Sequence, residues 1–148
     1  MIHSQADKSV VVIKAVSVAT DATQTGNVDT LGYDYCSIDV SLDSTSNVTN
    51  NPVVLKISEA DVTNTSSFAD ITAFVGDGSG GFVIANSSTD TPQVTRFDLN
   101  LAGGRKRYLK LSITSGTAAQ LVAATARLSR ASSQPSSLVS ASGNHVIG

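Results

Sequence analysis

The sequence is poor in the residues that carry most enzymatic and metal chemistry. It has one cysteine, two histidines, one glutamate and no tryptophan among 148 residues. The single cysteine, Cys36, excludes an intrachain disulfide, and its position in an alternating apolar run predicts a small buried side chain. One cysteine and two histidines near opposite ends of the chain are too few ligands for a zinc site. We therefore expect no metal and no cofactor.

Long apolar runs are also missing. No stretch approaches the roughly 20 apolar residues needed to cross a bilayer. The first residues lack the basic start and apolar stretch typical of a secretory signal. A membrane partner is therefore not expected.

The motifs of catalysis are absent too. Nucleophilic hydrolysis needs a nucleophile, a base and an orienting group within hydrogen-bond reach, but His3 and His145 both lie in the terminal segments. The glycine-rich stretch 77–81 lacks the lysine of a phosphate loop and the several oxygen ligands of a calcium loop. The aspartates fall in turns or at outward strand positions, where solvation explains them. We therefore expect no enzymatic activity.

What the sequence has in abundance is β-branched residues, with 40 Val, Ile and Thr in all. These side chains pack well on a pleated surface, which favours strands over helices. Short stretches of alternating apolar and polar residues, bounded by turn residues, predict an antiparallel sheet with one face in water. The expected strands cover 9–18, 36–42, 53–57, 71–75, 82–85, 96–101, 107–114 and 118–129.

The last of these segments fits two structures. Leu121, Ala124, Thr125 and Leu128 would form a helix face, whereas every second residue from Val122 to Leu128 would form a strand face. We favour a strand, because every neighbouring segment is a strand and a glycine-bearing turn leads into it. Residues 19–32 are polar, with two glycines, and fall outside the strand pattern.

These elements predict the all-β class: a single antiparallel β-sandwich or jelly-roll-like domain of about eight strands. The domain is expected to cover residues 9–130, with an N-terminal arm over 1–8 and a Ser-rich C-terminal arm over 131–148. The C-terminal arm has no charged residue and cannot bury enough surface alone to offset the entropy of ordering it. Either a neighbouring subunit holds it or it docks on its own domain. Its expected partner contacts are Pro135, Leu138, Val139 and His145.

Charge is divided unevenly along the chain. Residues 1–98 hold all twelve acids and four bases, a net charge of −8, whereas residues 99–148 hold six bases and no acid. Six bases with only Tyr108 interleaved are a weak nucleic-acid signal, so no nucleic-acid partner is expected. Two explanations stay open. In the first, the basic charges of the late strands neutralise the acidic charges of the early strands within the domain. In the second, acidic and basic surfaces meet between subunits.

The most distinctive local feature is residues 103–108, Gly-Gly-Arg-Lys-Arg-Tyr. The glycine pair predicts a tight turn, after which three cations stand together at the entrance to a strand. These cations either offset the acidic part of the chain or form a docking patch for an acidic partner surface, and the two roles are not exclusive. The predicted partner-binding residues of this patch are Arg105, Lys106 and Arg107.

Four segments resemble the small all-β structural proteins of tailed bacteriophages, specifically capsid decoration (cement) proteins. They lie within residues 31–130 and read Leu-Gly-Tyr-Asp-Tyr (31–35), Val-Leu-Lys-Ile-Ser-Glu-Ala-Asp (54–61), Phe-Val-Gly-Asp-Gly (74–78) and Gly-Arg-Lys-Arg-Tyr-Leu-Lys-Leu (104–111). The resemblance implies a β-sandwich or jelly-roll cement protein, often a homotrimer, on the outer capsid surface of the virion. There it would bridge adjacent major capsid proteins and stabilise the head, with no enzymatic activity or cofactor.

The alternative is a receptor- or carbohydrate-binding module on a phage tail or fibre. Binding of that kind generally uses exposed aromatic side chains stacked on sugar faces. The candidates here are Tyr33, Tyr35 and Tyr108, although we favour a packing role for all three.

Overall fold

The computed structural model describes residues 7–43, 52–84 and 92–131. Eight strands run through these ranges, and a short 3-10 helix, η1 (Thr65–Ser67), lies between the fourth and fifth. No helix in the described ranges is long and apolar enough to cross a membrane. The strands are β1 (Lys8–Val18), β2 (Thr23–Asp29), β3 (Tyr33–Leu42), β4 (Val54–Ala60), β5 (Ala69–Val75), β6 (Gln93–Asn100), β7 (Tyr108–Thr114) and β8 (Gln120–Ala131).

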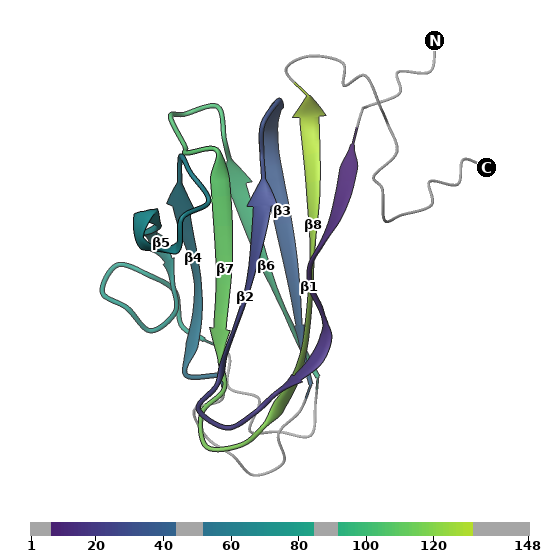
Figure 1. Ribbon diagram of the computed structural model, residues 1–148, viewed down its shortest axis with the longest axis vertical. Helices are drawn as coiled ribbons and strands as arrows, with labels where there is room; N and C mark the ends of the chain where they lie inside the picture. The colour runs from purple at the N-terminus through teal and green to yellow at the C-terminus, as the bar shows by residue number, and fades with distance from the viewer. Residues whose placement is uncertain (1–6, 44–51, 85–91, 132–148) are drawn as a thin grey trace, which may run out of the picture.

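The strands form two antiparallel four-stranded sheets that stack face to face (Figure 1). One sheet has the order β1-β8-β3-β6 and the other has the order β2-β7-β4-β5. The first strand pairs with the eighth, the second with the seventh, the third with the sixth and the fourth with the fifth. This nested pairing is the arrangement of a jelly roll. The predicted all-β sandwich of about eight strands is confirmed.

The core between the sheets is built mainly from aliphatic side chains. The inward residues of β3 and β7 are at most 2% exposed, and they alternate along each strand with more exposed polar ones. The alternation in the sequence is therefore the alternation between core and solvent. The core also contains an aromatic cluster, in which Phe74 and Phe82 each make an edge-to-face contact with the ring of Phe97. The inward residues of β3 and β7 are Cys36, Ile38, Val40, Leu42, Leu109, Leu111 and Ile113.

The prediction that residues 19–32 lie outside the strand pattern is wrong, because β2 covers Thr23–Asp29. Only Val28 of this strand is buried, so its sequence shows no apolar alternation. The strand forms through backbone pairing with β7. Gly26 also lies against β1, since a Cβ added there would be 2.1 Å from the Val12 carbonyl oxygen. The missing side chain lets β2 approach the backbone of β1 at this side of the sandwich.

The prediction of a strand over 82–85 is also wrong. In the described part of that range, 82–84, the chain makes one isolated bridge between Gly76 and Phe82. The Asp77 amide donates to the Phe82 carbonyl at 2.7 Å, and Asp77 Oδ1 accepts from the Ile84 amide at 3.1 Å. These bonds within the loop replace the ladder of a hairpin, and Ile84 is buried in the core.

The strand favoured over 118–129 is confirmed, because β8 runs from Gln120 to Ala131 between β1 and β3. Its inward residues, from Val122 to Leu128, are buried at every second position. β1 begins at Lys8, so the last residue of the predicted N-terminal arm belongs to the sheet. Ala131, the first residue of the predicted C-terminal arm, belongs to β8, and Asp7 of the predicted N-terminal arm pairs with Arg127 of β8. The rest of the two arms, 1–6 and 132–148, lies outside the described residues.

Candidate functional site

The predicted basic patch lies in the connection that leads from β6, across one end of the sandwich, to β7 (Figure 1). Gly104 has a φ of +89°, a left-handed backbone conformation that favours glycine. The turn therefore delivers the three cations to the start of β7, which is the strand entrance that the sequence predicts.

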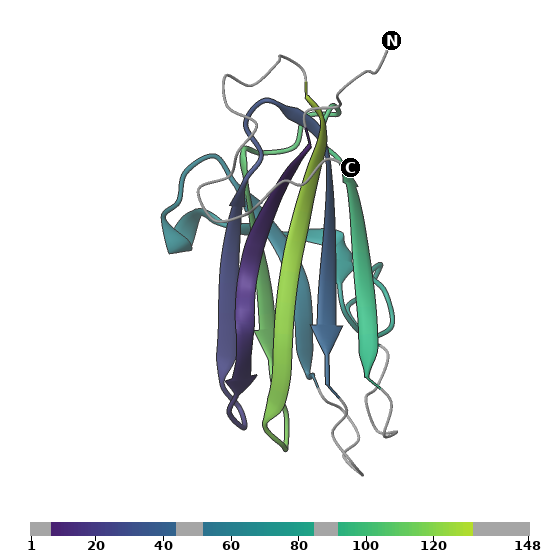
Figure 2. The ribbon, with the colours of Figure 1, turned by 90° about the vertical axis from the view of Figure 1, so that its right-hand side faces the viewer.

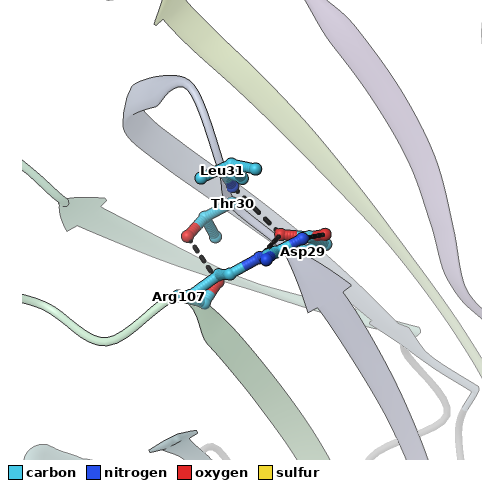
Figure 3. Close-up of polar contacts among 4 residues, drawn as sticks. All are labelled: Asp29, Thr30, Leu31 and Arg107. Atoms are coloured by element: carbon cyan, nitrogen blue, oxygen red, sulfur yellow. Dashed lines mark hydrogen bonds and ion pairs between the residues drawn. The ribbon is translucent and has the colours of Figure 1, made fainter. Parts of the chain in front are cut away.

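Arg107 clamps the turn that follows β2 (Figure 3). Its guanidinium donates two hydrogen bonds to Asp29, with Nε–Oδ1 at 2.9 Å and Nη2–Oδ2 at 2.7 Å. The hydroxyl and the amide of buried Thr30 both donate to the Arg107 carbonyl oxygen, at 2.6 and 3.0 Å. The Leu31 amide donates to Asp29 Oδ1 at 3.1 Å. Because a two-pronged charged pair is stronger than a neutral hydrogen bond, Arg107 fixes this turn and holds the pKa of Asp29 below its usual value.

Arg105 and Lys106 are engaged by acids at the end of β4. Arg105 Nη1 lies 3.2 Å from Glu59 Oε1, and the Lys106 amide donates to Glu59 Oε2 at 3.2 Å. Lys106 Nζ lies 3.7 Å from Asp61 Oδ2. Both basic side chains stay well exposed, so each ion pair contributes at most about 1 kcal/mol to stability.

All three cations of the predicted docking patch thus meet carboxylates of the same chain. For these residues the structure contains the neutralisation within one domain that was the first explanation of the charge division. Docking on an acidic partner would compete with three existing ion pairs, and it stays a prediction. The other predicted contact residues, Pro135, Leu138, Val139 and His145, lie outside the described residues.

A second polar cluster lies on the outer face of the β1-β8-β3-β6 sheet. Figure 2 shows this sheet facing the viewer. The cluster lines a depression of about 420 Å³, here called the polar hollow. Sequence reasoning missed this cluster because it treated the aspartates as separate solvated groups. The register brings the groups together, since outward positions of β6, β3 and β8 line up across the sheet. The lining residues are Asp7, Tyr35, Ser37, Asp39, Arg96, Asp98, Arg127 and Ser129.

Charges of both signs are paired within the polar hollow. Arg96 donates to Asp39 through Nε at 2.7 Å and Nη2 at 3.0 Å, which holds the pKa of Asp39 below its usual value. The Arg127 guanidinium donates to Asp7 Oδ2. A hydrogen bond to Asp98 raises the pKa of Tyr35. The hollow therefore offers charged groups of both signs and a neutral phenol.

An apolar depression of about 280 Å³, here called the apolar hollow, lies on the same face near the start of β8. Leu121 is 52% exposed there, and Val94 on β6, opposite Ser41 in the register, is 68% exposed. Along the strands, the outer face thus passes from charged to apolar. The lining residues are Ala15, Ser41, Leu42, Asp43, Pro92, Leu121, Val122 and Ala123.

Two further side chains that could carry chemistry, Cys36 and Asp77, have structural roles. Cys36 lies in the core, where burial raises the pKa of its thiol to about 12 and leaves almost no reactive thiolate at neutral pH. Asp77 uses its carboxylate to hold the loop after β5. Within residues 7–43, 52–84 and 92–131, no three His, Cys, Asp or Glu side chains gather to hold a metal ion.

Neither a scan against protein-family models nor a search of the curated proteins finds a match to this chain. The interpretation of function therefore rests on the geometry of the outer face and on the resemblance of the four segments.

The exposed ion pairs predict a loss of stability in acid. Three aspartates have a pKa held below the usual value mainly by a hydrogen bond to a cation: Asp29 by Arg107, Asp39 by Arg96 and Asp70 by Lys56. Their stabilisation is complete above the unfolded-state pKa of about 4 and is lost as the pH falls through the lower folded values. Solvent screening limits it to about 1 kcal/mol per pair.

Urea denaturation at about pH 6 and about pH 2 measures this loss, because the stabilisation is complete at the higher pH and decreases below the unfolded-state pKa of about 4. Asp29→Asn should be less stable at the higher pH and should lose less stability on acidification than the wild-type chain. If the free energy of unfolding of this variant fell as much between the two pH values as that of the wild-type chain, the Asp29–Arg107 pair would have no role in the acid sensitivity.

Proposed function

We propose that this protein is a structural, non-enzymatic virion component: a capsid decoration protein that binds the outer surface of a phage head. It bridges major capsid proteins and so stabilises the shell. The observation that carries the proposal is the outer face of the β1-β8-β3-β6 sheet, where the polar and apolar hollows lie on one surface. Protein interfaces likewise combine apolar contact with polar groups.

The positions of the similar segments support this proposal. Residues 54–61 cover β4 and the residue after it, and residues 104–111 run into β7, which pairs with β4. Glu59 joins the two segments through Arg105 and Lys106. Residues 31–35 begin within the turn that Arg107 holds and continue into β3. Three of the four segments that resemble decoration proteins therefore meet at one end of the sandwich, as expected of one shared structural unit.

The proposed mechanism is multivalent binding. Several copies around one symmetry axis raise the effective concentration of each contact, so a single surface needs only modest affinity. In this mechanism the outer face meets the major capsid protein, and the chain forms the homotrimer that the resemblance implies. The two predicted arms contact neighbouring subunits. Neither a cofactor, a membrane nor a nucleic acid takes part.

Two substitutions on the outer face test the proposal with capsids that lack the protein. Leu121→Asp puts a charge beside the apolar hollow, and Arg127→Glu reverses a charge in the polar hollow. Each should weaken capsid binding roughly tenfold, equivalent to about 1.4 kcal/mol, when bound protein is measured by cosedimentation with capsids. The defect of Arg127→Glu should be larger at low salt, where screening is least.

Thr25→Asp is the matched control, because it adds a charge at an exposed position on β2 in the other sheet. It should bind capsids as the wild-type chain does. Removing residues 132–148 should leave the domain folded and reduce capsid binding. Failure of the wild-type chain to bind, or full binding by both outer-face variants, would refute the proposal.

A tail- or fibre-associated carbohydrate-binding role is the second candidate, and the position of Tyr35 in the polar hollow favours it. The volume of this hollow falls within the range of small-ligand sites. Tyr108, by contrast, has the Arg107 guanidinium over its ring at 4.8 Å. A glycan array separates the two functions, since a specific signal abolished by Tyr35→Ala favours the second candidate, and no signal together with capsid binding favours the first.

A further inference from the structure

β6 is the last strand at one margin of the β1-β8-β3-β6 sheet, and within residues 7–43, 52–84 and 92–131 no strand pairs with its outer side. It pairs with β3 from Gln93 to Asn100 without a register shift, and no other described strand pairs with it. Figure 2 shows β6 at the margin of this sheet. A regular, unpaired edge presents backbone donors and acceptors to an incoming strand.

The other sheet edges are less suited to strand addition. β1, at the opposite margin of the same sheet, has two register shifts and carries Lys8 and Lys14, and both features oppose edge pairing. β5 pairs with β4 across a register shift. β2 lies against β1 at Gly26. Among the described strands, β6 therefore offers the most regular free edge.

One hydrogen bond establishes which backbone groups of β6 face outward. The Leu101 amide donates to the Asp34 carbonyl at 2.8 Å, so residue 101 and every second residue before it direct their backbone groups toward β3. The intervening residues direct their N–H and C=O groups toward the free edge, and their side chains are the exposed ones of the strand. These residues are Val94, Arg96, Asp98 and Asn100.

We infer that β6 pairs antiparallel with β6 of a second copy of this chain, about a two-fold axis at Phe97. Only the outward-directed, even-numbered residues exchange backbone hydrogen bonds across such a seam. With the axis at Phe97, Arg96 lies opposite Asp98 of the second copy, and Asp98 lies opposite its Arg96. A shift of two residues in either direction would oppose two Arg96 or two Asp98 side chains, which like-charge repulsion disfavours.

The seam continues a row of charges that already crosses the sheet. Arg96 binds Asp39 through two hydrogen bonds, yet its side chain is 63% exposed, so a second carboxylate has access from the free edge. A two-fold contact uses the same residues on both copies. Main-chain hydrogen bonds supply affinity, and the alternating side chains select the register. The two four-stranded sheets become one continuous sheet, and the two outer faces become neighbours.

This contact does not depend on the proposed capsid function. By itself it produces dimers, and together with the three-fold grouping that the resemblance implies it links two trimers. In both cases the assembly contains an even number of chains. Native mass spectrometry of the full chain therefore tests it without any capsid.

Two charge reversals give the sharpest test. Arg96→Asp places like acids opposite each other at both pairs of the seam, and Asp98→Arg places like bases there, so each variant should lose the even-numbered assembly. An equimolar mixture of the two should restore it, because every facing pair then joins an acid to a base. Lys14→Asp, a charge reversal on the opposite edge strand, should leave the assembly unchanged.

A backbone variant separates the edge contact from other charge effects. Val94→Pro removes an N–H that faces the free edge, not β3, so the domain should fold while the assembly is lost. Val94→Thr keeps the N–H and should assemble. Circular dichroism confirms folding in each case. Wild-type chain that is only monomeric or trimeric, assembly that survives Val94→Pro, or a mixture that stays unassembled would each overturn the inference.

Discussion

Gly26→Ala is expected to lower the free energy of unfolding by about 3 kcal/mol, because overfilling a tightly packed site forces the backbone to move. The added Cβ would lie 2.1 Å from the carbonyl oxygen of Val12 and 2.9 Å from its Cγ1. Relief requires β2 to separate from β1, at the side of the sandwich where the two sheets approach each other. Urea denaturation followed by circular dichroism measures the change.

Gly103→Ala is the control for this substitution. A Cβ at position 103 meets no atom within 4 Å, so the variant should be as stable as the wild-type chain or slightly more stable. Equal stability of Gly26→Ala and the wild-type chain would show that the contact between β1 and β2 is loose.

Ile38→Ala is expected to lower the free energy of unfolding by about 3 to 4 kcal/mol, the range for emptying a well-packed core position. Ile38 is fully buried on β3, where it is opposite Phe97 on one side and Ala126 on the other. Neighbours on two paired strands have little freedom to collapse into the cavity. The denaturation midpoint should fall without a change in the dependence on urea concentration.

Leu121→Ala is the control for Ile38→Ala. It removes the same number of carbon atoms, but from a site that is half exposed. Its expected loss is under about 1 kcal/mol, since little apolar area returns to water. If both variants lost the same stability, the assignment of Ile38 to the centre of the core would be incorrect.

The parts of the fold that the sequence predicts are those in which burial leaves a local pattern. Cys36, Ile38, Val40 and Leu42 alternate with polar residues because one face of β3 meets the core and the other meets solvent. The neighbouring strands correctly predict a strand over 118–129, where the residue pattern alone fits a helix as well. Residues 23–29 carried no such pattern, because β2 buries only Val28, and its strand structure comes from pairing with β7.

In the candidate site, too, the sequence predicts some features and only strand pairing decides the others. The three cations at 105–107 stand out in the sequence, but their partners are 45 to 78 residues away. Their ion pairs exist because β7 lies between β2 and β4. Likewise, Asp39, Arg96 and Arg127 belong to three strands, and only the order β8-β3-β6 places them in one hollow.

By itself, the sequence determined the all-β class, most of the strands and most of the core, since alternation with a period of two reports burial residue by residue. The tertiary structure alone decided which strands are neighbours, which charges neutralise one another and which of the described strands lie at the sheet edges. Those outcomes depend on sheet order and register between segments far apart in the chain, and no local pattern encodes the distance between two such segments.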